Sequence, residues 1–517
     1  MSTEDQNRAV VTLHKGVDTE AFVNEMLDAG YELHNEKPGS KRNFDFVMTQ
    51  AQAATLREDS RIIDVRYGSK VENGMILTQA ATETVSMQMS KDTGATVGTD
   101  FGNWAHASCV QATDPFSGNS ITIPYNWNYN LTGKDVDVVI QDSGVQPDHP
   151  EFLGQDNSTV RYQTVDWPTI SGLSQYTQPT NFHRDIDGHG THVASTACGK
   201  RLGWAKEANV YSMKILDDPG NTFGASASFE MIRAWHNSKK TSNPQDDSVP
   251  IRPTIVNMSW GYFGLYENIA DGVYRSAGWI GTTRQEQYGM VAGQQSEGVY
   301  TFPVRVASVD ADVQDCLDDG IIMVGAAGNG SHKIDVPGGL DYDNYFISSS
   351  LGNRYYHRGS SPCAVPGVIN VGNISYVYQS GSEPLFNSSE KGPRVDICAP
   401  GGIIVGAIPN GSTKFGSIAT VPHPDNNGYV IGQLNGTSMA SPQVCGVLAQ
   451  LMEVRPHYTK EQHLEWLQLV SESNRLYDPS TGTPSTDYTN FRALQGAANL
   501  YLKTPFSASS QPYSFST

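Results

Sequence analysis

Three short segments carry side chains that could together perform nucleophilic catalysis. They centre on Asp142, His189 and Ser438, each of which lies within two residues of a glycine. A serine hydroxyl becomes a strong nucleophile when a histidine takes its proton and a carboxylate orients that histidine. The reaction would be attack on a carbonyl carbon, with hydrogen-bond donors needed for the oxyanion that develops. The three residues predict acyl-transfer chemistry if the fold brings them together.

Each segment also has a less specific interpretation. Asp142, in an Asp-Ser-Gly sequence, could simply cap a turn. His189 and His192 are three residues apart, as in some metal sites, but no cysteine or His-Glu-x-x-His sequence accompanies them. We therefore predict that His192 packs inside a helix. Ser441 offers a second hydroxyl close to Ser438, and we interpret it as structural.

The elements that must position these residues are short apolar strands. From about residue 134 the chain alternates apolar runs with glycine-rich turns; the runs are 136–140, 210–216, 254–258, 321–325 and 368–371. This pattern is typical of the α/β class, with a parallel sheet covered by helices on both faces. Strand ends in such sheets face the ligand crevice, which suits Asp142. Ser438 is expected at a helix N-terminus, where the helix dipole stabilises negative charge.

The segments DSG, HGTHVA and GTSMASP, in the order Asp, His, Ser, resemble the signature motifs of the subtilisin family (subtilases, peptidase family S8). The resemblance covers residues 130–475 outside the insertions and includes 256–261, 326–329 and 395–401. It implies a subtilisin-like three-layer fold, with a mostly parallel sheet between helices. It also implies a serine endopeptidase with Asp142, His189 and Ser438 as its triad.

The same resemblance implies roles for further residues. Asn329 would donate its side-chain amide to the oxyanion, beside the backbone N–H of Ser438. Extended substrate would lie along Ser259, Trp260 and Gly261. The primary specificity pocket would be completed by Ala327, Gly328 and Ser360.

An uncharged Ser360 at the base of this pocket would suit apolar or aromatic side chains. The insertion next to it carries three acidic residues, and one of them could instead reach in and favour a basic side chain. These residues are Asp335, Asp341 and Asp343.

No metal or other cofactor is expected to be required. The family has calcium-binding members, but between His192 and Trp204 this sequence has no added loop to wrap an ion. Glu151 stands where those members carry a ligand carboxylate. Weak calcium binding by the acidic stretch 310–319 is the remaining option, and a solvated acidic face is the preferred interpretation.

Residues 1–72 predict a separate small domain. Strands over 9–14, 31–34, 44–48 and 61–67 alternate with helices that Asp18 and a Thr49–Gln52 capping box would start. The order β-α-β-β-α-β indicates an α+β ferredoxin-like unit. It resembles the family's inhibitory propeptide, so the chain is expected to be a self-processing zymogen. Its N-terminal domain would then be a partner in cis, cut off between about Gly68 and Asp100.

The rest of the chain is divided by composition. Residues 73–115 are polar and predict a linker, and 116–503 form the catalytic domain, with insertions near 262–312 and 330–358. Residues 504–517 predict a polar tail. Six cysteines form no Cys-x-x-Cys pair, and Cys198, Cys398 and Cys445 are expected to be buried thiols.

Charge and composition limit the partners. A net charge of −19 over 517 residues argues against nucleic acid, and no run of about 20 apolar residues indicates a membrane span. Protein or peptide substrates are expected. The N-terminus shows no secretory signal, which favours a cytoplasmic or virion-associated location over classical secretion. The chain also resembles subtilase-like proteins of large tailed phages, so the alternative function is a virion-associated or structural protein that retains the subtilase fold.

Overall fold

The computed structural model describes most of the chain. The described residues are 8–14, 16–33, 43–67, 81–90, 101–110, 116, 122–241, 252–267, 271–273, 299–348, 352–377, 382–412, 420–479, 493–505 and 507–508. The chain divides into two compact units: residues 1–81 together with 512–517, and residues 82–511.

The N-terminal unit is the predicted α+β unit. Its elements are β1 (Arg8–Leu13), α1 (Thr19–Asp28), β2 (Glu32–Leu33), β3 (Asn43–Val47), α2 (Gln50–Leu56) and β4 (Ile62–Tyr67). The strands form an antiparallel sheet in the order β2-β3-β1-β4. Asp18 caps α1, and Thr49 and Gln52 make the predicted capping box at the start of α2. The turn predicted near Pro38 lies outside the described residues.

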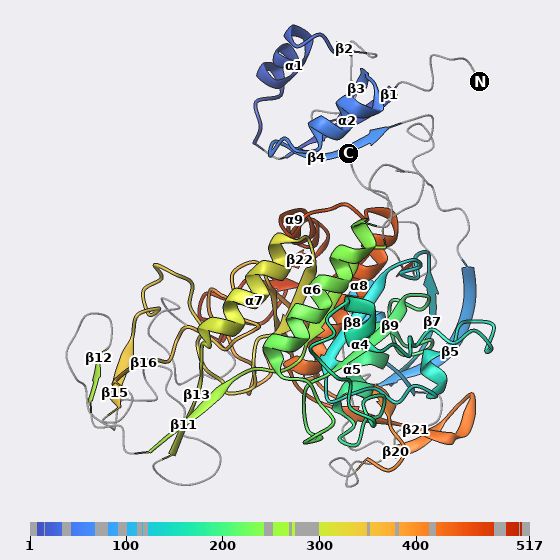
Figure 1. Ribbon diagram of the computed structural model, residues 1–517, viewed down its shortest axis with the longest axis vertical. Coiled ribbons are helices and arrows are strands. Elements are labelled where there is room, and N and C mark those ends of the chain that lie inside the picture. Colours follow the sequence, from blue (N-terminus) through green and yellow to red (C-terminus); the bar gives the residue numbers. More distant parts are fainter. Residues whose placement is uncertain are drawn as a thin grey trace. The chain divides into compact units, whose positions relative to one another are not determined.

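The second unit is built on an eight-stranded sheet (Figure 1). Its strands, in spatial order, are β22 (Glu472–Ser473), β23 (Leu500–Tyr501), β18 (Ile397–Pro400), β17 (Ile369–Ile374), β14 (Ile322–Ala326), β10 (Thr254–Met258), β8 (Asp137–Asp142) and β9 (Asn209–Lys214). Every adjacent pair is parallel except β22 with β23. The central strands are buried along their whole length, as expected for a parallel sheet covered on both faces.

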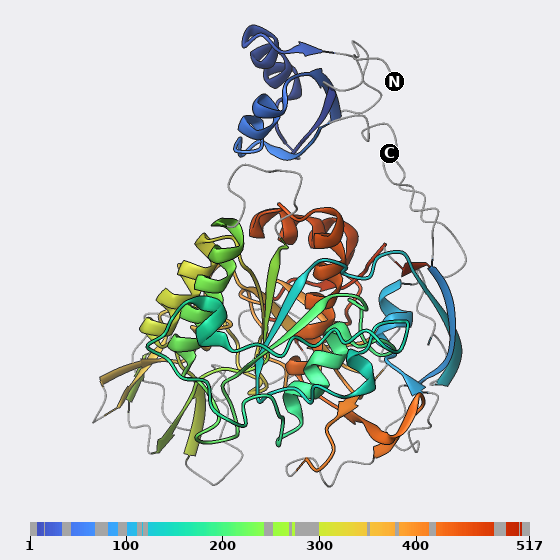
Figure 2. The same cartoon turned by 45° about the vertical axis from the view of Figure 1, so that its right-hand side comes forward.

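Helices cover both faces of this sheet (Figure 2). On one side lie α6 (Ala225–Thr241) and α7 (Ala307–Asp318), together with the short α4 (Trp167–Ser171). On the other side lie α5 (His189–Cys198) and α8 (Thr437–Val454), which share one core with the sheet. The remaining helix of this unit's C-terminal part is α9 (Lys460–Val470). The three-layer α/β prediction is confirmed.

Smaller sheets surround the core. The strands β19 (Ile404–Ile408), β21 (Asn426–Leu434) and β20 (Thr420–His423) form one of them. The predicted insertions contribute β11 (Phe263–Glu267) paired with β13 (Val299–Pro303), and β12 (Asp271–Val273) paired with β15 (Tyr345–Ser348) and β16 (Gly352–Tyr355). The insertion predicted over 262–312 extends too far, because α7 begins at Ala307 and belongs to the core.

The linker prediction for 73–115 is wrong in its C-terminal part. This stretch contains β5 (Ala81–Ser90), β6 (Phe101–Gly102) and α3 (Ala105–Val110), and residues 102–110 are buried. The indole of Trp104 donates to the carbonyl of Gly402 at 2.8 Å, so the segment is fixed by a partner about 300 residues away. Its polar composition gave no sign of this contact.

The predicted tail is also partly ordered. β24 (Ser507–Ala508) pairs with β7 (Thr122–Tyr129), and with β5 and β6 they form a sheet in the order β24-β7-β5-β6. All six cysteines are buried and unbridged, as predicted for three of them. Among the helices that the structure describes, none has the length and apolar character needed to cross a membrane.

Candidate active site

Asp142 and His189 meet at the carboxyl end of strand β8. Asp142 is the last residue of β8, and His189 is the first residue of α5. The Asp142 Oδ1 and His189 Nδ1 atoms are 2.8 Å apart, and the carboxylate is fully buried. A Cβ atom at position 190 would lie 2.1 Å from the carbonyl oxygen of Gly144, so only glycine lets the helix come this close to the strand end. The structure therefore joins two of the three predicted catalytic residues.

A second carboxylate, Asp185, organises the turn that leads to His189. Its Oδ1 accepts hydrogen bonds from the backbone N–H of Gly188 (2.8 Å) and from the hydroxyl of Ser143 (3.1 Å). Its Oδ2 accepts from the N–H of Thr191 at 2.9 Å. Asp185 thus ties the start of α5 to the residue that follows Asp142, and we interpret it as a positioning residue that the sequence reasoning missed. Its place four residues before His189 was the available signal.

The electrostatics of His189 favour a base of raised basicity. Burial disfavours the imidazolium, but the charge of Asp142 and the hydrogen bond that its carboxylate accepts from the ring outweigh burial, with smaller contributions from Asp187 and Asp185. The pKa of His189 is therefore raised above its ordinary value. His192, one turn later, is fully buried and bonds the carbonyl of Ile404 at 2.9 Å, and burial lowers its pKa to about 3. This is the packing role predicted for it.

Ser438 is the second residue of α8, and the N-cap of this helix is Gly436, whose φ of 148° favours glycine. Helices α5 and α8 pack against each other, which brings the starts of both helices to the same end of the sheet. The Ser438 hydroxyl donates to the carbonyl of Ser259 at 3.3 Å and is slightly exposed. Ser441 is fully buried, with its Oγ 2.9 Å from that of Ser259. The two serines therefore differ in exposure: Ser438 is 8 % exposed, whereas Ser441 is fully buried.

Asn329 presents its amide nitrogen to the same place. Its Oδ1 accepts from the backbone N–H (2.9 Å) and the hydroxyl (3.0 Å) of Thr437, so its Nδ2 remains as a donor. A Cβ built on Gly436 would be 3.3 Å from Asn329 Nδ2 and 3.6 Å from the Ser438 nitrogen. The nitrogen atoms of both predicted oxyanion donors therefore lie near Gly436 at the start of α8, where a developing negative charge would be stabilised.

The predicted specificity residues are partly brought together. Gly261 faces Ser360, whose Oγ would lie 2.5 Å from a Cβ at position 261, and Ser360 is buried. The Trp260 ring instead stacks on Phe229 of α6, and its indole N–H donates to Gln141 at 3.1 Å. Ala327 is buried, and the N–H of Gly328 donates to Thr437 at 3.2 Å.

The three acidic residues proposed from the sequence to enter this pocket are engaged elsewhere. Asp341 pairs with Lys333 at 2.6 Å, and Asp335 accepts from the backbone of residues 336 and 341. Asp343 pairs with Arg358 at 2.5 Å, with its side chain 75 % exposed. Each carboxylate already has a partner within the insertion, so none of the three is free to receive a basic substrate side chain.

The acidic residue that does lie against the predicted specificity pocket, at Gly328, is Glu390. No motif indicated it. A Cβ at Gly328 would lie 2.5 Å from the Glu390 carboxyl carbon, and both carboxyl oxygens are buried without a hydrogen-bond partner among the described residues. Burial raises the pKa of Glu390 well above its ordinary value. Its position is set by a long-range bond from its own N–H to the Gly328 carbonyl (2.9 Å), which a sequence pattern cannot indicate.

Calcium does not fit the position of Glu151. One carboxylate oxygen bonds His423 Nε2 at 2.9 Å, and the other accepts from the backbone N–H groups of Arg201 and Leu202. Within the acidic stretch 310–319, Asp310 pairs with Arg305, and Asp315 and Asp319 pair with Arg233. No cluster of three or more His, Cys, Asp or Glu side chains in the described part of the chain is arranged to hold a metal ion.

A histidine bonded to a buried aspartate, a serine at a helix start and two nearby N–H donors are the components of a serine-hydrolase centre. The comparison with known proteins agrees. The model of the subtilase family matches residues 133–486, so this chain belongs to the subtilase family. It is therefore a serine endopeptidase of the subtilisin type.

Individual relatives are distant. Subtilisin E of Bacillus subtilis is 23% identical over 450 residues, which cover 86% of this chain and 87% of that protein. A subtilase-type proteinase of Saccharomyces cerevisiae is 25% identical over 364 residues, 69% of this chain, and the match spans about half (52%) of the yeast protein. Among solved structures, a cold-adapted subtilisin-like serine proteinase is similar with a TM-score of 0.44 and 21% identity, covering 78% of this chain and 97% of that one.

Proposed function

We propose that this subtilase cleaves peptide bonds through an acyl-enzyme formed on Ser438. The Ser438 Oγ attacks the carbonyl carbon while His189 Nε2 takes its proton. Asp142 holds the opposite ring nitrogen and stabilises the imidazolium. His189 then gives the proton to the leaving amine, and a water molecule, deprotonated by the same histidine, releases the acyl group.

The oxyanion of each tetrahedral intermediate would be held by Asn329 Nδ2 and the Ser438 N–H. For attack, the Ser438 hydroxyl must exchange its present acceptor, the Ser259 carbonyl, for His189. A weak 3.3 Å bond makes this exchange easy, and catalytic hydrogen bonds often form only once substrate is present.

The observation that carries this proposal is the 2.8 Å contact between Asp142 and His189 at the start of α5, the helix that packs against α8. A fluorophosphonate probe tests it, because the probe reacts only with an activated serine. Wild-type protein and Ser441→Ala should be labelled, and Ser438→Ala should not. Labelling of folded Ser438→Ala would refute the assignment of the nucleophile.

We further propose that the N-terminal unit is an excised propeptide. Its compact α+β core supports a separately folding inhibitor. The cut must precede Ala81, because β5 belongs to a sheet of the catalytic unit with β6 and β7. Intact-mass spectrometry should show active wild-type protein shorter than Ser438→Ala by this unit. Active protein that keeps residues 8–67 would identify the unit as a permanent accessory domain.

For specificity, we propose that the primary pocket takes an apolar or aromatic side chain, because Ser360 at its base is uncharged and the neighbouring aspartates are paired. Profiling cleavage sites in a peptide library tests this. A preference for lysine or arginine before the cut would instead indicate that Glu390 acts in the pocket.

A further inference from the structure

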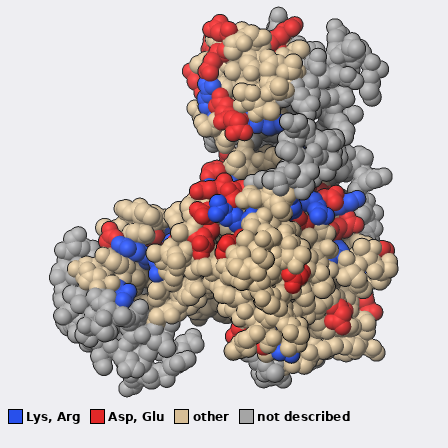
Figure 3. Space-filling view, in the orientation of Figure 1, with Lys and Arg blue, Asp and Glu red and all other residues tan. Residues whose placement is uncertain are grey.

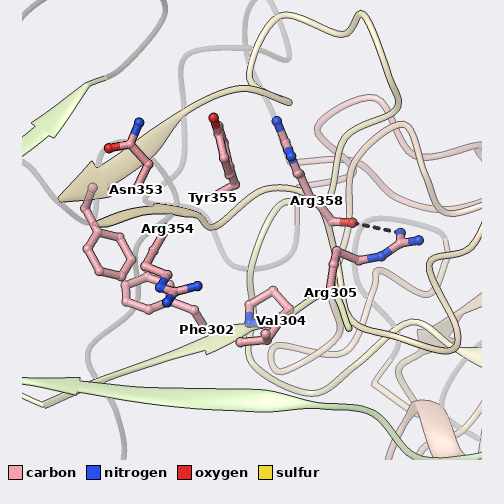
Figure 4. A pocket seen from close by; sticks show the side chains of 9 residues that line it. Phe302, Val304, Arg305, Asn353, Arg354, Tyr355 and Arg358 are labelled. Atoms are coloured by element: carbon pink, nitrogen blue, oxygen red, sulfur yellow. Dashed lines mark hydrogen bonds between the residues drawn. The ribbon is translucent and has the colours of Figure 1, made fainter. Parts of the chain in front are cut away.

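A cavity of about 160 Å³ lies between the end of β13 and the strand β16 (Figure 4). Three arginines line it, Arg305, Arg354 and Arg358, together with the rings of Phe302, Phe346 and Tyr355. Figure 3 shows basic side chains gathered on this part of the surface, although the chain as a whole is strongly acidic. Which of these guanidinium groups could bind a ligand depends on which of them is already paired with an acidic side chain.

Two of the three guanidinium groups are neutralised. Arg305 pairs with Asp310 at 3.0 Å and donates to the Ala364 carbonyl at 2.7 Å. Arg358 pairs with Asp343 at 2.5 Å, and its guanidinium lies 3.4 Å from the centre of the Tyr355 ring. Both are thereby held in place as fixed parts of the wall.

Arg354 differs from the other two arginines. Within the described part of the chain it forms no ion pair, and its Nε is buried without a hydrogen-bond acceptor. Figure 4 shows its side chain extending from β16 toward Phe302, away from the side on which Asn353 and Tyr355 lie. A buried donor left unpaired is costly, so a native structure that keeps one calls for a ligand or another acceptor. Among the described residues, the cavity therefore holds one uncompensated positive charge.

The rest of the wall is aromatic. Phe302 and Phe346 are buried, with ring centres 5.0 Å apart, and Tyr356 packs against both. A guanidinium that has no ion-pair partner among the described residues and lies beside aromatic rings fits a monoanion with an apolar body. A guanidinium fork matches the two oxygens of a carboxylate, whereas a doubly charged phosphate would need a second free cation. The volume is below the 300–1,000 Å³ of typical drug-sized sites and suits one side-chain-sized group.

We propose that this cavity binds a single carboxylate carried on an apolar or aromatic group, with Arg354 as its counter-ion. Such a group can belong to a polypeptide, as an acidic side chain or a chain terminus, or to a free small acid.

The location favours a polypeptide that the enzyme is cutting. The Val304 carbonyl, on the cavity wall, accepts from the N–H of Ser361 at 3.0 Å, and the N–H of Val304 donates to Tyr262 at 2.8 Å. Ser361 and Tyr262 directly follow Ser360 and Gly261 of the predicted specificity pocket. The cavity is therefore adjacent to that pocket and would hold an acidic residue of the substrate. This assignment to substrate rests on the proposed function, whereas carboxylate binding does not.

Binding is tested first, in Ser438→Ala protein that cannot cleave. Titration calorimetry with 3-phenylpropionate should show binding, and the uncharged 3-phenylpropionamide should bind far more weakly. Arg354→Gln should lose roughly ten- to hundredfold in affinity, because a charge-assisted hydrogen bond is removed. The affinity of Arg354→Lys, which keeps the positive charge but not the planar guanidinium fork, should lie between those of the parent protein and Arg354→Gln. Arg233→Gln, at a surface arginine of α6 that pairs with Asp315 and Asp319 and does not line the cavity, is the matched control and should bind like the parent.

Three outcomes would overturn carboxylate binding: no heat with the acid, equal affinity for acid and amide, or undiminished affinity in an Arg354→Gln protein whose melting temperature is unchanged. The source is then tested with wild-type enzyme and peptide pairs that differ only by Glu against Gln. A kcat/KM advantage for the Glu peptides that Arg354→Gln abolishes supports the substrate assignment. Equal kcat/KM values would overturn that assignment and identify free small acids as the ligand. Failure of the proposed peptidase function would appear as absent fluorophosphonate labelling and would leave the calorimetry unchanged.

Discussion

The region around Asp142, His189 and Ser438, here called the catalytic corner, differs from the insertion around residues 330–358 in how its charged side chains are held. At the catalytic corner, Asp142 and His189 are held by short local elements, a strand end and a helix start. In the insertion, Asp341 forms an ion pair with Lys333, and Asp343 forms one with Arg358. Arg354 has no acidic partner among the residues that the structure describes. Motifs locate side chains well when the neighbouring backbone fixes them, and poorly when the fixing contact comes from far along the chain.

The largest expected effect separates the two histidines of the catalytic corner. His189→Ala should lower kcat by about 10⁶-fold, the size of loss found when the catalytic histidine of subtilisin is removed, with the fold intact. His192→Ala should keep fluorophosphonate labelling but lower the melting temperature, because the Ile404 carbonyl loses its partner. Steady-state kinetics and thermal unfolding of both variants measure this contrast. Normal turnover in His189→Ala would contradict the triad.

The next effect concerns the insertion. Lys333→Met should destabilise the catalytic unit by about 3–5 kcal/mol, because it leaves Asp341 as an uncompensated buried charge. Asp343→Asn is the control: its side chain is 75 % exposed, and loss of its pair with Arg358 should change stability by less than about 1 kcal/mol. Urea denaturation compares the two. Similar losses in both variants would show that burial does not distinguish these pairs.

Returning to the catalytic corner, Asn329→Ala should lower kcat by about 10²–10³-fold, or about 2.7–4 kcal/mol, the loss found for the oxyanion asparagine in subtilisin itself. KM should change little, because the amide acts on charge that develops only in the transition state. The kcat and KM of a chromogenic peptide measure this. A raised KM with unchanged kcat would assign Asn329 to substrate binding instead.

Glu390 provides a pH-dependent test at the border between the two regions. Its folded-state pKa is raised above 4.5, so above pH 4.5 the unfolded chain ionises while the native carboxyl keeps its proton. Stability should therefore fall as pH rises from 4.5 toward the folded pKa. Glu390→Gln cannot ionise, so its melting temperature relative to wild type should improve between pH 4.5 and pH 8. A pH-independent difference would show that Glu390 has a partner or stays charged.

The smallest expected effect is that of metal removal. EDTA should leave activity and melting temperature unchanged, because the Glu151 oxygens are already satisfied by His423 and two backbone N–H groups. Melting curves with and without EDTA check this. A drop in melting temperature that calcium restores would reveal an ion site elsewhere in the chain.

Much of the architecture was predictable because it follows local rules. The strands at 254–258 and 321–325 were evident as apolar runs, and the Thr49–Gln52 capping box marked its helix. Asp142, His189 and Ser438 were located by their motifs, and the structure places each at the expected strand end or helix start. Their catalytic roles stay predictions.

The parts that could not be predicted depend on distant contacts. α3 was mistaken for linker because Trp104 is anchored by Gly402. Glu390 meets Gly328 through a bond across 62 positions, and the pairing of Asp341 with Lys333 depends on how the insertion folds back on itself. Neither composition nor periodicity reports such contacts, whereas turn and cap preferences act within a few residues.

The small sheet β24-β7-β5-β6 has a mechanical consequence. The first strand of the catalytic unit, β5, and its last, β24, lie in this one sheet with only β7 between them. A force that pulls the two ends of the unit apart would load this ladder of backbone hydrogen bonds first. The eight-stranded sheet and the residues at its edge would bear no tension until that ladder had torn. The catalytic corner is thereby insulated from strain applied through the chain ends.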